Sequence, residues 1–159
     1  MAKNMKLDTL LVPVDFTPFS EEALLFASVL ARKLKAKLLV LHVIHDPEEA
    51  PGFYAQKGKK KKFMRFMDEA ANEMMDEFIK KMCKAYPDHK PINNATTLLV
   101  TGTVVTRIVE IAEKKKAGMI VIGSHGRTGL SRLLIGSKAQ QVVKLSSVPV
   151  TVVKTSPES

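Results

Sequence analysis

Five short runs of apolar residues, rich in valine, isoleucine and leucine, punctuate the chain. They occupy residues 9–14, 37–44, 95–101, 119–122 and 148–154. Within each run the apolar residues stand largely at consecutive positions rather than at alternate ones. That pattern is typical of strands buried on both faces of a parallel sheet. The sequence therefore predicts five parallel strands.

Segments with apolar residues at helical spacing separate these runs. They predict helices over residues 17–34, 63–85, 103–116 and 136–146. Thr17 and Pro18 suit the N-cap and the first helical position of the first helix. The second helix carries a stripe that we expect to face the core rather than a partner, formed by Phe63, Met67, Ala70, Met74, Phe78 and Met82.

Strands and helices thus alternate along the chain. Parallel neighbours need right-handed crossovers, and the crossover helices cover both faces of the sheet. The predicted fold class is α/β, a doubly wound five-stranded parallel sheet. The 159 residues suffice for one domain, 1–159, in which residues 45–62 form a lysine-rich connection. Ligands of such sheets bind at the carboxyl ends of the strands, where the strand order reverses.

Composition narrows the class of protein. Hydrophobic residues make up 45% of the chain and charged residues 26%, which is ordinary for a folded domain. The single cysteine, Cys83, excludes an internal disulfide, and the absence of a CxxC pair excludes a zinc ribbon or a thioredoxin-like redox site. No apolar stretch approaches the 18 or so residues of a membrane span, so we expect a cytoplasmic protein that does not bind membranes.

The positive charge is concentrated in one segment. Of the formal net charge of +9, six charges come from lysines and one arginine between residues 57 and 65, which contain no acid. The remaining +3 is ordinary. Residues 59–62 therefore form either a solvated surface or a binding site for nucleic acid or an acidic partner.

Three glycines and a serine mark the candidate binding loop. The spacing runs from Gly123 and Gly126 to Gly136 and Ser137, between a predicted strand and a predicted helix. Glycine lets the backbone approach phosphate closely, and the free N–H groups at a helix start bind anions. The pattern indicates a phosphate cradle, with a plain strand-to-helix loop as the alternative. Arg127 flanks the loop, where it either meets phosphate or is an ordinary exposed arginine.

Competing motifs are absent from the sequence. No G-x-x-x-x-G-K-S/T occurs, and the first strand-to-helix turn contains no glycine, which excludes a Walker loop and a dinucleotide fingerprint. Ser124 stands beside His125, but neighbours on a loop rarely meet in the geometry of a catalytic triad, and no G-x-S-x-G elbow is present. We therefore expect no hydrolase of that type.

Four landmarks together resemble the universal stress protein family, in its ATP-binding branch. They are VPVDFT at residues 12–17, LHVI at 41–44, the glycine loop just described, and VPVTVV at 148–153. They occur in order, and the similarity covers nearly the whole chain. The resemblance implies a strand order of 3-2-1-4-5, ATP as ligand with Mg²⁺ on its phosphates, and a homodimer that pairs through residues 148–153.

The resemblance also assigns the nucleotide-binding residues, which are Pro13, Asp15, Val43, Gly123, Gly126, Arg127, Gly136 and Ser137. It places Asp15 near the ribose and the backbone of Val43 against the adenine. Gly123 and Gly126 are expected along the ribose–phosphate path, and Gly136 and Ser137 at the phosphates. Asp15 has an alternative role in the turn before Thr17.

The expected function is that of a nucleotide-responsive stress protein. No Walker-type lysine and no general base can be named, so we expect slow ATP hydrolysis or none, and no catalytic residue. The alternative is an interaction protein whose lysine-rich connection, residues 59–62, binds nucleic acid or an acidic partner.

Overall fold

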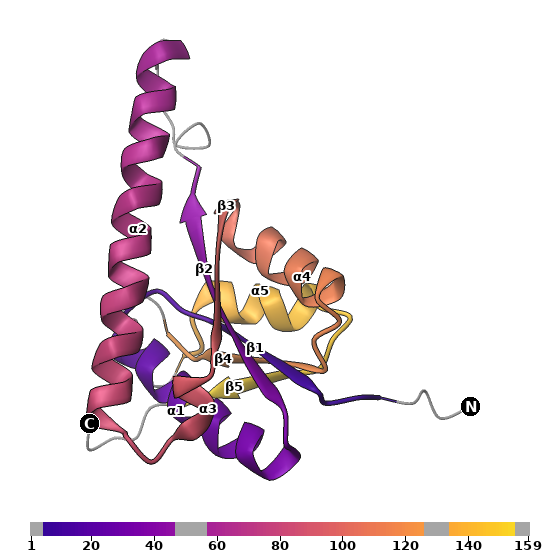
Figure 1. Cartoon of the computed structure of the whole chain (residues 1–159). Coiled ribbons are helices and arrows are strands. Elements are labelled where there is room, and N and C mark those ends of the chain that lie inside the picture. The colour runs from indigo at the N-terminus through magenta and orange to yellow at the C-terminus, as the bar shows by residue number, and fades with distance from the viewer. Residues whose placement is uncertain (1–4, 47–56, 126–133, 155–159) are drawn as a thin grey trace.

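The sheet has the predicted class and order. The computed structural model describes residues 5–46, 57–125 and 134–154 (Figure 1). Five strands pair in the order β3-β2-β1-β4-β5, and every neighbouring pair is parallel. The strands are β1 (Thr9–Pro13), β2 (Lys37–His45), β3 (Thr96–Gly102), β4 (Met119–Gly123) and β5 (Val150–Val153). The doubly wound fold and the order 3-2-1-4-5 are therefore confirmed.

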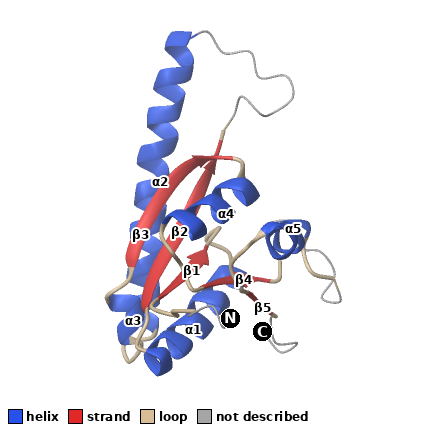
Figure 2. Ribbon diagram, turned by 90° about the vertical axis from the view of Figure 1, so that its right-hand side faces the viewer, coloured by secondary structure: helices blue, strands red, loops and turns tan. Residues whose placement is uncertain are grey.

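Helices cover both faces of the sheet, as Figure 2 shows. They are α1 (Pro18–Leu34), α2 (Lys57–Ala85), α3 (Lys90–Asn93), α4 (Val104–Lys114) and α5 (Ser137–Leu145). Leu10 and Val12 of β1 belong to one buried cluster with α1, α2 and α3, whereas Leu11 belongs to a second cluster with α4 and α5. Alternate side chains of one strand thus enter two cores, which explains its uninterrupted apolar sequence.

The strand order reverses between β1 and β4. From β1 the chain moves outward through β2 to the edge strand β3, then crosses back to β4 beside β1 and ends at the other edge, β5. The crevice at the carboxyl ends of β1 and β4 is the place where such sheets bind ligands. The candidate residues of the glycine loop and of the first turn follow these two strands.

Helix α2 differs from its prediction in two ways. It begins at Lys57 rather than at residue 63, so the lysine run forms its first turns instead of a connection. Its buried side chains are Ala71, Met75, Phe78 and Met82, whereas Phe63 and Met74 are 39% and 44% exposed. The expected core stripe is therefore wrong at its amino-terminal end. The first turns of α2 extend past the sheet (Figures 1 and 2), and the buried residues of α2 begin at Ala71 in the described part of the chain.

Smaller features complete the fold. The short helix α3, which the sequence did not predict, inserts the fully buried Ile92 under α1 and α2. Thr17 caps α1 as predicted, since its hydroxyl accepts from the backbone N–H of Ser20 at 3.4 Å. Thr103 is the N-cap residue of α4 but makes no side-chain capping bond. In the described part of the chain, no helix has the length and apolar character to cross a bilayer.

Candidate functional site

The turn after β1 is organised around the carboxylate of Asp15. Its Oδ1 atom accepts three hydrogen bonds, from the backbone N–H of Thr17 at 3.2 Å, the hydroxyl of Thr17 at 2.5 Å and the hydroxyl of Ser20 at 2.6 Å. The backbone N–H of Asp15 in turn donates to the Ser20 oxygen at 2.9 Å. The turn role considered for Asp15 is therefore real, and it holds the start of α1 against the end of β1.

The second carboxylate oxygen of Asp15 takes no part in this turn. All three bonds use Oδ1, and the side chain is only half-buried. A carboxylate has four lone-pair positions, so Oδ2 keeps its capacity to accept a hydrogen bond from a ligand. The same residue can thus build the turn with one oxygen and keep the other for a ligand.

Phe16, next to Asp15, has a left-handed backbone with φ of 65°. This conformation is uncommon for a large non-glycine residue and costs free energy that its surroundings must offset. The Phe16 ring lies 4.4 Å from the His42 ring and 5.6 Å from the Phe78 ring, measured between centroids. His42 is itself fixed by a hydrogen bond between Nδ1 and the carbonyl of Val14 at 2.8 Å. Packing against β2 and α2 therefore stabilises the turn.

The backbone of Val43 points past the end of β1. The N–H of Val14 donates to the carbonyl of Leu41 at 2.8 Å, so the polar groups of Leu41 face β1. Backbone direction alternates along a strand, and Val43, two residues on, faces the same side. Because β1 ends at Pro13, the backbone of Val43 opens onto the crevice, while its side chain is buried. This is the position that the adenine prediction requires.

Gly123, the last residue of β4, has a packing reason to be glycine. A Cβ atom built there would lie 2.9 Å from the carbonyl oxygen of Phe19, in the first turn of α1. Real Cβ atoms do not approach backbone so closely, so α1 can pack on β4 only where the side chain is absent. The predicted contact of Gly123 with the nucleotide stays a prediction.

Ser124 and His125 meet after all, contrary to our expectation for loop neighbours. The Ser124 hydroxyl lies 2.9 Å from His125 Nδ1, and the His125 ring lies 5.2 Å from that of Phe19. Both residues are buried, Ser124 to the extent that only 2% of it is exposed. Burial of both side chains favours a structural role for this pair at the end of β4.

The start of α5 is tied directly to the end of β4. The N–H of Gly136 donates to the carbonyl of Ser124 at 2.6 Å, and the carbonyl of Gly136 accepts from Gln140, the first bond of the helix, at 3.1 Å. The amides of residues 137–139 precede that first helical bond, so they are donors that the helix itself does not satisfy. Free amides of this kind, together with the helix dipole, are what the predicted phosphate cradle requires.

The predicted residues therefore fall into three groups. Pro13, Asp15, Val43 and Gly123 lie at the carboxyl ends of β1, β2 and β4, and Gly136 and Ser137 lie at the amino end of α5. Gly126 and Arg127 lie outside the described residues. Sequence reasoning missed Phe16 and Ser20. The spacing of Asp15, Thr17 and Ser20 was a signal for the latter, whereas nothing in the sequence indicates the left-handed backbone of Phe16.

Solved structures with the same fold include universal stress proteins. The UspA protein of Lactobacillus plantarum aligns with a TM-score of 0.74 at 23% identity, covering 94% of this chain and 99% of that one. A universal stress protein in complex with cAMP aligns with a TM-score of 0.61 at 23% identity. One from Archaeoglobus fulgidus in complex with dAMP aligns at 0.57 and 21% identity. At these identities the likeness shows the fold alone.

Sequence relatives are closer. The universal stress protein MJ0531 of Methanocaldococcus jannaschii is 33% identical over 145 residues, which cover 91% of this chain and 81% of the relative. The protein MJ0577 of the same organism is 30% identical over 151 residues, covering 91% and 93%. The model of the universal stress protein family matches residues 6–154. This chain belongs to the universal stress protein family.

Proposed function

We propose that this protein binds ATP, with Mg²⁺ on the phosphates, and acts in the cytoplasm as a nucleotide-responsive stress protein. One observation carries the proposal. The hydrogen bond between Gly136 and Ser124 brings the amino end of α5 to the end of β4, beside the turn of Asp15. A site for anions and an acceptor for hydroxyl groups thus adjoin at the reversal of strand order.

Each part of a nucleotide finds a matching group there. The open backbone of Val43 offers a donor and an acceptor to the edge of an adenine. Oδ2 of Asp15 is an acceptor for a ribose hydroxyl. The amides of residues 137–139, which begin just after Gly136 and lack a partner within the helix, are donors for phosphate. Gly126 and Arg127 complete the proposed loop. Fold relatives in complex with cAMP and dAMP support a ligand that contains adenine and phosphate.

The metal is proposed to arrive with the nucleotide. Among the residues that the structure describes, no three His, Cys, Asp or Glu side chains group closely enough to hold a metal ion. Mg²⁺ is usually bound through one or two carboxylates and substrate phosphates, with waters filling the remaining positions. Bound in this way, it would neutralise phosphate charge.

The same geometry favours binding over turnover. Backbone amides at a helix start bind ground-state phosphate, and uniform binding of ground state and transition state gives affinity without rate. The one serine–histidine pair of the site is buried. We therefore expect hydrolysis that is slow or absent, and a single-turnover assay with radiolabelled ATP measures it directly.

The proposal is tested first by identifying small molecules released when the purified protein is denatured, and then by calorimetric titration. Gly136→Val should weaken ATP and ADP alike while affecting adenosine less, because the side chain occupies space at the phosphate amides. Gly136→Ala is the matched control, since its methyl group is smaller than the valine side chain and cannot accept a hydrogen bond from these amides. If the wild type binds no nucleotide at millimolar ATP with Mg²⁺, the proposed function is wrong.

We further propose that the protein dimerises through β5. Ile120 and Ser124 donate to the carbonyls of Pro149 and Val153, so alternate residues of β5 face β4. The backbones of Val150 and Val152 consequently face outward along the edge of the sheet. An open edge of this kind pairs readily with its own copy across a two-fold axis.

A further inference from the structure

The first half of α2 contributes no residue to the proposed nucleotide site. The helix has 29 residues, which correspond to a length of about 43 Å. Its first buried side chain among the described ones is Ala71. The turns before it extend past the sheet (Figure 1). Tertiary packing supplies most of the stability of protein helices, and in the described part of α2 the buried side chains that could supply it begin only at Ala71.

An apolar stripe runs along this projecting half. Phe66 is 65% exposed, Met74 44% and Phe63 39%, and all three are large hydrophobic side chains. Together with Met67 and Ala70 they repeat at intervals of three or four residues, which places them on one side of the helix. Exposed large apolar side chains gathered along one side of a helix are typical of an interaction site.

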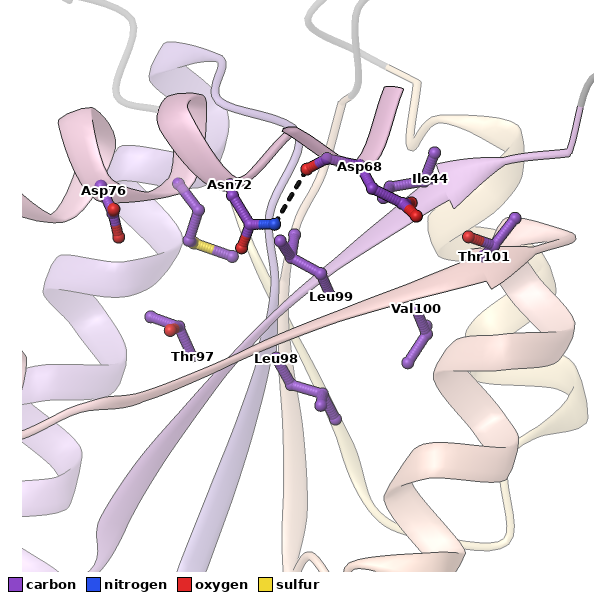
Figure 3. Close-up of a pocket in the computed structure, with 10 residues that line it drawn as sticks. Ile44, Asp68, Asn72, Asp76, Thr97, Leu98, Leu99, Val100 and Thr101 are labelled. Atoms are coloured by element: carbon purple, nitrogen blue, oxygen red, sulfur yellow. Dashed lines mark hydrogen bonds between the residues drawn. The ribbon is translucent and has the colours of Figure 1, made fainter. Parts of the chain in front are cut away.

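The charges in residues 59–77 of α2 are divided into two blocks. Residues 59–65 carry four lysines and an arginine without an acid, and residues 68–77 carry five acids without a base. Arg65 and Glu69 form an ion pair between the blocks, at 3.4 Å. Asp68 and Asp76 instead border an open groove of about 470 Å³ between α2 and the edge strand β3 (Figure 3).

The two blocks are related by a two-fold pattern centred near residue 68. Lys59 and Glu77 are 18 residues apart, which is five helical turns, so they lie at the same angle around the helix. Lys62 and Glu73 are 11 residues apart, about three turns. Phe63 and Met74 show the same separation. These three pairs share nearly one midpoint, although each joins unlike residues.

We propose that α2 is a dimerisation helix that packs antiparallel against α2 of a second copy of this chain. A two-fold axis beside residue 68 places Lys59 and Lys62 of each copy opposite Glu77 and Glu73 of the other. It also sets Phe63 against Met74 on both sides of the axis. In such an isologous interface every contact occurs twice, so the sequence must complement itself. The charge blocks satisfy this condition, and flanking charges of this kind fix orientation in paired helices.

A polyanion fits α2 less well than a second copy does. Nucleic acid lying along the helix would meet the lysines first and then five carboxylates within the next three turns. Phosphate is repelled by those carboxylates, whereas an antiparallel helix brings its own lysines to them. The exposed phenylalanine and methionine side chains also gain burial only against an apolar partner. This surface is separate from β5, and the inference does not depend on nucleotide binding.

A charge exchange between two variants tests the pairing. K59E/K62E makes one face of α2 wholly acidic, and E73K/E77K makes it wholly basic, so each variant repels itself. The four residues are exposed, and both variants should keep the circular dichroism of the wild type. K59E/K62E is labelled at its amino terminus and sedimented with increasing amounts of either unlabelled variant. Pairing through β5 contributes equally to the two titrations, so their difference reports on α2.

We expect K59E/K62E to bind E73K/E77K at least about tenfold more tightly than it binds itself. The mixed pair restores both exposed ion pairs on each side of the axis, with their charges exchanged on one of the two sides. The difference should shrink at 500 mM NaCl. K114E/K115E, with the same change of charge at the end of α4, should associate like the wild type. Equal affinities in the two titrations would overturn the proposal. If the two affinities are equal, and the wild type binds duplex DNA whereas K59E/K62E does not, the lysines bind a polyanion instead.

Discussion

The roles of the two carboxylate oxygens of Asp15 can be distinguished by comparing Asp15→Asn with Asp15→Ala. Alanine removes the acceptor of three hydrogen bonds, from Thr17 twice and from Ser20. Asparagine keeps a carbonyl oxygen at the Oδ1 position and replaces only the second oxygen, Oδ2, by an NH2 group. Allowing for the partial exposure of the turn, Asp15→Ala should lower the free energy of unfolding by at least about 2 kcal/mol, and Asp15→Asn by less than about 1 kcal/mol.

The effect on nucleotide affinity should differ from the effect on stability. Loss of a charged hydrogen bond to the ribose is worth about 1.5–3 kcal/mol, so Asp15→Ala should weaken ATP by roughly 10- to 150-fold. Asparagine places an NH2 donor at the position of Oδ2, so the ribose hydroxyl would accept a neutral hydrogen bond instead of donating a charged one, a loss of about 1–1.5 kcal/mol or roughly 5- to 13-fold. Binding of 2′,3′-dideoxy-ATP should hardly respond to Asp15→Asn, because that analogue has no ribose hydroxyl.

Urea unfolding and calorimetric titration of both variants with ATP, adenosine and the dideoxy analogue provide the measurements. The reasoning is refuted if Asp15→Asn binds ATP as the wild type does, since Oδ2 would then contact no ribose. An equal loss of ATP and dideoxy-ATP would refute it as well, because Asp15 would then act on binding only through the shape of its turn.

Three further predictions follow from backbone geometry. Gly123→Ala should lower the free energy of unfolding by about 1–3 kcal/mol, because the new Cβ meets the Phe19 carbonyl at 2.9 Å, and an unchanged urea midpoint would contradict this. Val152→Pro removes an outward N–H and should abolish a β5 dimer in light scattering while the monomer stays folded, whereas Thr151→Pro, whose N–H faces β4, should unfold the protein. Phe16→Gly should be about 1 kcal/mol more stable than Phe16→Ala in thermal unfolding, because alanine keeps the cost of a left-handed backbone and glycine does not.

The sheet was predictable because burial on two faces leaves a strong local signal. Leu10, Leu11 and Val12 are each fully buried, so the strand needs apolar residues at every position, and the sequence displays that need directly. Helix α2 shows the limit of the same reasoning. Its apolar stripe predicts a helix correctly, but periodicity does not say where the underlying sheet ends. The stripe therefore predicted a buried Phe63, whereas 39% of this residue is exposed.

The candidate site was predictable in its position and less so in its contacts. The positions of Asp15 and Gly136 follow from topology, because both stand where a strand ends or a helix begins at the reversal of strand order. The packing of Gly123 on Phe19 and the bond between Ser124 and His125 depend on how α1 settles against β4. Such contacts between distant segments are invisible to local patterns, since they are set by the tertiary arrangement.

Phe16 connects the turn of Asp15 to helix α2 through a side-chain contact. Its ring contacts Phe78 of α2, which lies 10 residues from Asp68. A ligand that changed the conformation of the turn would therefore also change this contact with α2. Thermodynamic linkage is reciprocal, and an event at one end that changes the equilibrium at the other must itself be changed by the same factor. If the turn moves when nucleotide binds, the concentration of protein would enter the apparent affinity for ATP. ATP binding and dimerisation through α2 would then be coupled through the side chain of Phe16.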